Sequence, residues 1–99
     1  MSKNKGARGE REVAEILSGY GFEARRGRQF CGSPDSPDVI SPEFPLHIEV
    51  KRVERLNLSE AFKQAEEDSG EKPACVIHRK SREDWKISLN LTDFLKMLK

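Results

Sequence analysis

The sequence has little of what would stabilise a large or an exported protein. Its 99 residues include only two cysteines, Cys31 and Cys75, with no CxxC spacing, so neither a zinc site nor a disulfide framework is expected. Hydrophobic residues make up only 35% of the chain, and no apolar run approaches the roughly 18 residues that suggest a membrane span. No signal peptide is visible. We therefore expect a single domain, 1–99, in a reducing cytoplasm and away from membranes, with residues 1–6 disordered.

The chain also lacks an excess of either charge, since its net charge is only +1. Its basic residues are nevertheless clustered, at 3–11, 25–28, 51–55 and 78–82, whereas acidic residues concentrate at 60–71. Such clusters suit a polyanionic partner, because each Lys or Arg near a phosphate releases counterions. An ordinary solvated surface would look the same, so charge alone leaves both interpretations open. The low apolar content is compatible with a homodimer, in which a second copy covers part of the surface.

The pattern of apolar residues predicts an α/β domain with a small mixed central β-sheet flanked by helices. Helical spacing runs from about Ala7 to Gly19, and Asn57 with Glu60 has the pattern of a helix N-cap. Gly, Ser and Pro between residues 26 and 37 indicate a long loop. The expected elements are a helix at 7–19, a possible short strand at 22–25, a hairpin of strands 38–40 and 46–53, a helix from 58 to about 70, strands 74–78 and 85–89, and a final short helix that contains Phe94.

Two carboxylates are predicted to face each other across the hairpin. If residues 42–45 form a four-residue loop, Asp38 lies opposite Glu49, with Cβ atoms about 4.5–5.5 Å apart. Carboxylates this close repel each other, and one becomes protonated unless a cation lies between them. Oxygen ligands of this kind suit Mg²⁺ or Mn²⁺. Pairing with nearby surface arginines would satisfy the two groups as well.

Lys51 is predicted to share the face of Glu49. The two residues are two positions apart on one strand, so their side chains leave the same side, while Ile48 and Val50 leave the other and can enter the core. An ammonium group there can position the attacking water, accept its proton or neutralise charge on a phosphate, and these roles stay open. A Glu-Val-Lys strand also occurs in proteins without such chemistry.

A third carboxylate, Glu10, lies at the edge of the apolar stripe of the first helix, beside Val13 and Ala14. Glu12 and Glu15 are expected to point into solvent. A carboxylate at a buried edge needs a partner, because unpaired burial is costly. A metal ion, its bound waters or a neighbouring backbone segment would each supply one.

Together these residues resemble the signature of the PD-(D/E)xK nuclease superfamily. Pro37-Asp38, followed after a short gap by Glu49-Val50-Lys51, matches the motif, and Glu10 matches the acidic residue of the preceding helix. The sequence is most similar to the archaeal-type Holliday junction resolvases and their phage relatives, through residues 5–12 (KGARGERE) and a serine-bearing loop before Asp38.

The resemblance implies a restriction-endonuclease-like core and an endonuclease that uses Mg²⁺, with Mn²⁺ as a substitute, on DNA during recombination. It also implies a bacterial cell or a phage-infected host. Asp38, Glu49 and the Val50 carbonyl would hold the metal, Lys51 would act on the attacking water, and Glu10 would support the metal site, directly or through water. The residues implied to contact DNA are Arg11, Arg25, Arg26, Arg28, Ser33, Ser36 and Arg52, and Gln64 on the next helix is a further polar candidate.

Two points remain open within this resemblance. Pro34-Asp35 competes with Pro37-Asp38, and we prefer Asp38 because the strand-like pair Val39-Ile40 follows it. The substrate is also open. A four-way junction needs two symmetric nicks, which a C2 homodimer supplies, but a nicking, flap or restriction-like nuclease would use the same site. A binding module without catalysis is the third alternative, and the paired carboxylates argue against it because they repel phosphate.

Overall fold

The chain forms a mixed sheet of five strands with three helices, in a computed structural model that describes residues 2–27 and 37–99 and side chains from Ala7 onward. This confirms the predicted fold class. The elements are α1 (Ser2–Gly19), β1 (Arg25–Arg26), β2 (Val39–Ile40), β3 (His47–Arg52), α2 (Leu58–Asp68), β4 (Ala74–Arg79), β5 (Lys86–Leu89) and α3 (Leu91–Leu98). The strands lie in the order β1-β2-β3-β4-β5, and only the central pair β3–β4 is parallel.

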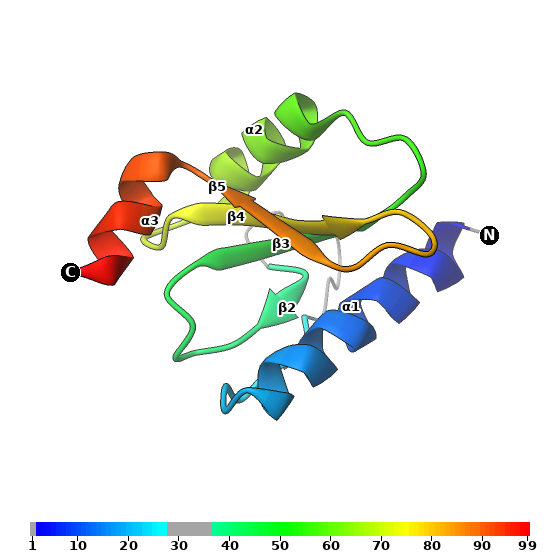
Figure 1. Cartoon of the computed structure of the whole chain (residues 1–99), viewed down its shortest axis with the longest axis horizontal. Coiled ribbons are helices and arrows are strands. Elements are labelled where there is room, and N and C mark those ends of the chain that lie inside the picture. The colour runs from blue at the N-terminus through cyan, green and yellow to red at the C-terminus, as the bar shows by residue number, and fades with distance from the viewer. Residues whose placement is uncertain (1, 28–36) are drawn as a thin grey trace.

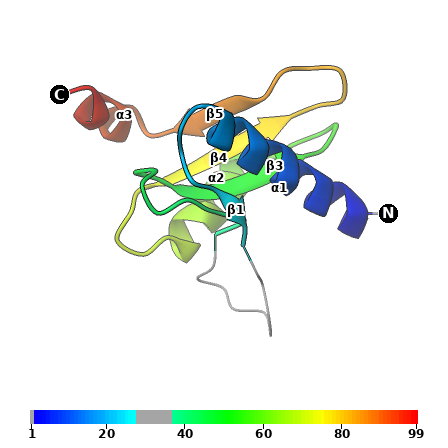
Figure 2. The same cartoon turned by 90° about the horizontal axis from the view of Figure 1, so that it is seen from below.

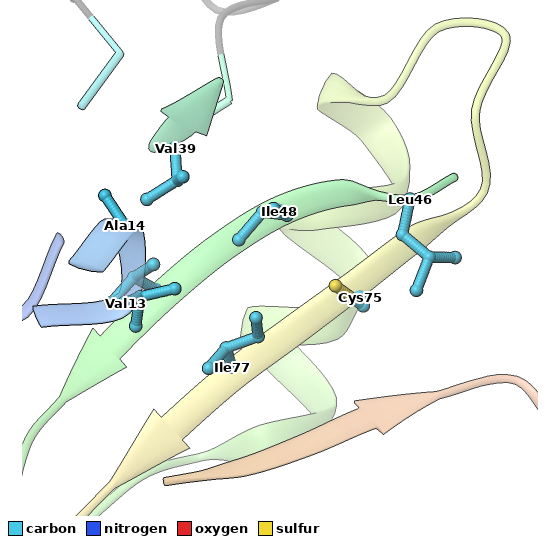
Figure 3. Close-up of a cluster of buried hydrophobic side chains, with 8 residues drawn as sticks. Val13, Ala14, Val39, Leu46, Ile48, Cys75 and Ile77 are labelled. Carbon is cyan, nitrogen blue, oxygen red and sulfur yellow. The ribbon is translucent and has the colours of Figure 1, made fainter. Parts of the chain in front are cut away.

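Two of the helices cover opposite faces of the sheet, with α1 below and α2 above it in Figure 1. Alternation along β3 separates the faces, because Ile48 and Val50 point toward α1. Glu49 and Lys51 point toward α2. Under α2 the core is made mainly of small residues that let the helix approach closely, Ala61, Ala65, Ala74 and Val76. Under α1 it comprises Val13, Ala14, Val39, Leu46, Ile48, Val50, Cys75 and Ile77 (Figure 3).

The first helix begins earlier than its apolar pattern indicated. It starts at Ser2 rather than near Ala7, so the expectation that residues 1–6 are disordered is wrong for residues 2–6, whose backbone is helical. Apolar periodicity is absent there, yet nothing before Ala7 breaks a helix as proline would. Each residue added to an existing helix gains a backbone hydrogen bond without a new nucleation cost.

The β2–β3 hairpin has the predicted register, with Val39 paired to Ile48. Two polar side chains hold the chain around the turn of this hairpin. The Ser41 hydroxyl donates to the Glu23 carbonyl at 2.6 Å, and the Lys72 ammonium donates to the carbonyls of Phe44 at 2.8 Å and Pro42 at 3.2 Å. The hairpin is therefore attached both to the segment before β1 and to the loop before β4.

The second helix has the predicted N-terminal cap. The Asn57 side chain accepts from the Glu60 N–H at 3.1 Å and donates to the Glu60 carboxylate at 2.9 Å. The helix ends at Asp68, where the Ser69 N–H bonds back to the Ala65 carbonyl, just before the predicted stop at Gly70. This cap fixes where α2 begins relative to the end of β3.

The C-terminal segment divides into a packed part and an exposed part. Trp85, which directly precedes β5, packs against the core under α1. The helix α3 has no buried residue, and Figure 2 shows it beyond the end of the sheet. In the described part of the chain, no helix is long and apolar enough to cross a membrane.

We predict that Ile48→Ala destabilises the domain by about 2–5 kcal/mol, because Ile48 is only 1% exposed and the deletion leaves a cavity at the centre of the sheet. Ile87→Ala makes the same deletion on β5 at a side chain that is 46% exposed, and should cost under about 1 kcal/mol. Urea unfolding of both variants measures the difference. Equal losses would contradict this description of the core.

Candidate active site

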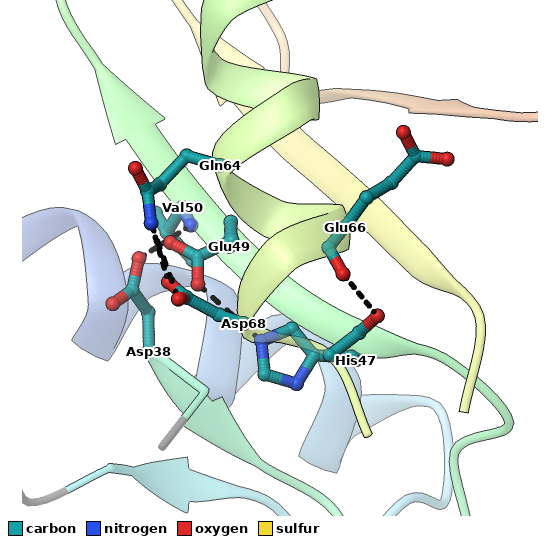
Figure 4. Close-up of polar contacts among 8 residues, drawn as sticks. Asp38, His47, Glu49, Val50, Gln64, Glu66 and Asp68 are labelled. Atoms are coloured by element: carbon teal, nitrogen blue, oxygen red, sulfur yellow. Dashed lines mark hydrogen bonds and ion pairs between the residues drawn. The ribbon is translucent and has the colours of Figure 1, made fainter. Parts of the chain in front are cut away.

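The hairpin brings Asp38 and Glu49 together, as the register predicted. Both side chains are buried, at 7% and 8% exposure, and their carboxyl groups share a hydrogen bond. Figure 4 shows them side by side at the edge between β2 and β3, on the face that α2 covers. Two acidic groups therefore occupy one buried position, where both can be charged only if a cation accompanies them.

Hydrogen bonds to the backbone of β3 hold both the main chain and the side chain of Asp38 in place. Its N–H donates to the Ile48 carbonyl at 2.9 Å, and its carboxylate accepts from the Val50 N–H at 2.8 Å. The N–H and the carbonyl of a strand residue point to the same edge, so the Val50 carbonyl faces the side on which Asp38 lies. Gly27 approaches so closely that an added Cβ would lie 2.0 Å from the Pro37 carbonyl oxygen, so no larger residue fits there.

Within this pair, the carboxyl group of Glu49 has a strongly raised pKa. Its pKa is raised from 4.5 to about 8, first by burial, then by the charge of Asp38 and the hydrogen bond to it, and then by the charge of Asp68, while Lys51 opposes the shift. At neutral pH and without a cation, Glu49 therefore favours its protonated form. Within the described residues, no cluster of three or more His, Cys, Asp or Glu side chains could hold a metal ion. A metal held by the two carboxylates would need the Val50 carbonyl, water or substrate oxygens as further ligands.

Two neighbours of Glu49 were missed by the sequence pattern. The Nε2 atom of the buried His47 lies 3.4 Å from the Glu49 carboxylate, and Asp68 approaches from the end of α2 (Figure 4). Alternation did place His47 on this face, but an isolated histidine gave no reason to assign it a role. Asp68 could not be placed, because its approach depends on how α2 crosses the sheet.

Lys51 and Gln64 also lie between β3 and α2. Lys51 is half-buried two positions beyond Glu49, and Lys51 and Gln64 line one groove that includes neither Asp38 nor Glu49. The Gln64 amide donates to the Asp68 carboxylate at 3.1 Å, one helical turn away. Gln64 is exposed, and this hydrogen bond connects it to the residue that approaches Glu49.

Glu10 lies close enough for the charge of Asp38 to act on it, and its nearest partner is an arginine. The Arg26 Nε donates to the Glu10 carboxylate at 3.0 Å. Burial raises the pKa of Glu10, the Arg26 hydrogen bond lowers it, and the Asp38 charge raises it further. Glu10 thus lies beside the carboxylate pair, and Arg26, predicted to contact DNA, also neutralises Glu10.

The other predicted DNA contacts are not brought to this site as a group. Arg11 and Arg25 are exposed, whereas Arg52 is on the opposite face of β3 from Lys51. There it lies 3.9 Å from Glu12, which also accepts from the Trp85 indole N–H at 3.1 Å. The Arg79 Nε lies 3.8 Å from the same carboxylate. Glu12 was expected to point into solvent, but its carboxylate faces Arg52, Arg79 and Trp85, and its side chain is only 32% exposed. Arg28, Ser33, Ser36 and the competing Asp35 lie outside the described residues.

A mixed sheet flanked by helices, with two facing carboxylates and a lysine on adjacent strands, defines a nuclease of the PD-(D/E)xK type. Comparisons with known proteins agree. The family model described as archaeal Holliday junction resolvase (Hjc) matches residues 1–88, and the chain belongs to this family. It is thereby a structure-specific DNA endonuclease, a hydrolase of a family of metal-dependent nucleases.

A solved structure supports the same assignment. The 1.6 Å structure of Hjc from Archaeoglobus fulgidus, a Holliday junction resolvase from an archaeal hyperthermophile, is similar with a TM-score of 0.62 and 28% sequence identity. The match covers 86% of this chain and 72% of that one. No curated protein sequence matches the chain.

We predict that the metal-free protein loses stability as the pH rises from 4.5 to about 8, because the raised pKa of Glu49 favours its protonated form in the folded state only. Thermal melting in EDTA across this range measures the loss. Glu49→Gln should melt with a weaker pH dependence. Mg²⁺ should raise the melting temperature of the native protein most at the alkaline end, where it no longer competes with the proton. A variant as pH-dependent as the native protein would contradict this assignment.

Proposed function

We propose that the chain nicks four-way DNA junctions in a reaction that depends on Mg²⁺, with Asp38, Glu49 and Lys51 as the catalytic residues. The observation that supports this most is the burial of Asp38 and Glu49 side by side, which raises the pKa of Glu49. A divalent cation relieves the repulsion between the two carboxylates, and Mg²⁺ or Mn²⁺ suits a site whose donors are carboxylate and carbonyl oxygens. We also propose that the protein acts on DNA in the cytoplasm of its cell.

Each residue has a defined part in this proposal. Asp38, Glu49 and the Val50 carbonyl hold the cation, which supplies positive charge for the phosphoryl oxygens and lowers the pKa of water. Lys51 holds the attacking water in line with the phosphate and stabilises the charge that develops on it. Glu10 lies beyond Asp38, where it orders water around the carboxylate pair. His47 supports Glu49 from within the fold.

We further propose that the active form is a homodimer joined through α3 and the neighbouring edge of β5. Phe94, Leu95 and Leu98 are 43–66% exposed on a helix with no buried residue. Apolar surface of this kind, contiguous along one helix, is typical of an interface. A C2 dimer also places two active sites for the two nicks that resolve a junction.

The first test is cleavage of a labelled four-way junction and a matched linear duplex, with Mg²⁺ or with EDTA. The native protein should make paired nicks near the branch point only with Mg²⁺. Asp38→Ala and Lys51→Ala should each lower the rate at least about 100-fold, since each removes a group that acts on the transition state. Asp35→Ala, the matched change at the competing Pro-Asp pair, should leave the rate within about threefold.

Three results would change the assignment. Equal cleavage of junction and duplex would keep the active site but make the protein a general nuclease. Binding of junctions without cleavage in either Mg²⁺ or Mn²⁺ would contradict the catalytic proposal. Loss of activity in Asp35→Ala with full activity in Asp38→Ala would show that the other aspartate holds the metal.

The dimer has a separate test. Leu95→Glu introduces a charge at the centre of the apolar face of α3 and should yield a monomer in sedimentation velocity, because burying an unpaired charge is costly. Lys96→Glu, one position along the same helix, is the matched control and should stay dimeric. On a cruciform plasmid the monomer should give mainly nicked circles where the dimer gives linear product. A dimeric Leu95→Glu protein would place the interface elsewhere.

A further inference from the structure

A groove lies beside Lys51 that the proposed hydrolysis does not use. It occupies about 350 Å³ between the end of β3 and the first turns of α2. Its apolar lining residues are buried or half-buried and are called its floor here: Val53, Leu56 and Ala61. Its polar lining residues are mostly exposed and are called its rim: Lys51, Asn57, Glu60 and Gln64. The groove thus begins at a proposed catalytic residue and is not lined by Asp38 or Glu49.

The chemistry of this groove suits one flat heterocycle. Its volume falls within the range of sites for small ligands, which combine apolar walls with a few polar groups. A base has apolar faces and a polar edge, so its ring can lie on the floor while the edge meets the rim. The Glu60 carboxylate can accept from an exocyclic amine, as acidic side chains do from cytosine, and the Gln64 amide can donate or accept.

We propose that this groove receives the nucleobase next to the scissile phosphate after it has left the base stack. This inference rests on the proposed function, because Lys51 connects the groove to the reacting phosphate. A nucleotide whose phosphate lies at Lys51 has its own base within reach of the groove. The occupant is therefore part of the DNA substrate rather than a free ligand.

Occupation of the groove would explain a preference for branched DNA. Taking a base out of a duplex costs a few kcal/mol, and the cost is lower where stacking or pairing is already interrupted. A branch point interrupts stacking between arms, whereas a linear duplex does not. The same groove thus admits a base from a junction at lower cost, without reading its sequence through the major groove.

Base insertion can be measured without cleavage. 2-Aminopurine, which fluoresces more strongly when unstacked and carries an exocyclic amine, is placed in turn at each position around the nick site of a four-way junction. Native protein is added with Ca²⁺ in place of Mg²⁺. We expect a fluorescence increase at one nucleotide beside the scissile phosphate, and none at the same nucleotide in a linear duplex. An increase spread evenly over all positions, or none at any, would overturn the proposal.

Variants on α2 provide the second readout. Glu60→Trp fills the groove from its rim, while Ser59→Trp adds the same side chain at the preceding, exposed position that does not line it. Glu60→Trp should lower the ratio of junction to duplex cleavage at least about tenfold, which corresponds to about 1.4 kcal/mol. Ser59→Trp should leave this ratio unchanged. Removing the Glu60 charge strengthens attraction to phosphate, so general loss of DNA affinity would not explain the result.

Gln64→Trp fills the same groove from another position and guards against a local folding defect in Glu60→Trp. Thermal melting and Mg²⁺-induced stabilisation confirm that each variant is folded and binds metal. An unchanged cleavage ratio in both filled variants would overturn the proposal. Junction cleavage without a base signal would reject the groove and keep the nuclease. A base signal lost in the filled variants, without any cleavage of DNA, would keep the groove and reject the catalytic proposal.

Discussion

The site depends on the hydrogen bond from the Val50 N–H to the Asp38 carboxylate, at 2.8 Å. This bond takes the place of a backbone acceptor, because β2 begins only at Val39 and the ladder of β3 would otherwise lack a partner at this point. The Asp38 side chain thereby extends the hydrogen bonding of the sheet, and its position is as fixed as that of a strand residue. Gly27 allows the chain to pass close to Pro37, and so leaves Asp38 where Glu49 can reach it.

The arrangement of the two sheet faces follows from the same strand. On one face of β3, Ile48 and Val50 join the larger core under α1; on the other, His47 and Glu49 are buried but polar. The second face can tolerate this because α2 packs on β4 through Ala61 and Ala65 rather than through large side chains. The helix covers the polar residues without filling the space beside Lys51. The candidate site therefore lies on the face of β3 whose core is made of small side chains.

Local rules were sufficient for the parts of the site that lie near one another in sequence. The four-residue turn predicted which residue faces Glu49, and strand alternation predicted the face of the sheet on which Lys51 lies. The capping pattern predicted where α2 starts. These local rules failed for Glu12, whose partner Trp85 is 73 residues away, and for Asp68, whose position depends on helix packing. Glu10 was placed at a buried edge correctly, but only the fold shows that Arg26 reaches it.

A raised pKa at Glu49 and an unfilled groove at Lys51 have a common physical origin. Both follow from how α2 lies over β3, since it covers the Glu49 carboxyl beside Asp38 and leaves space beside Lys51. Burial of one carboxyl beside another lowers the stability of the free domain. A domain with only 35% hydrophobic residues tolerates such costs at few places. Both places lie on one face of one strand, two residues apart. In the proposed function a cation would relieve the repulsion at Glu49, and binding would then recover the free energy that its burial costs the free domain.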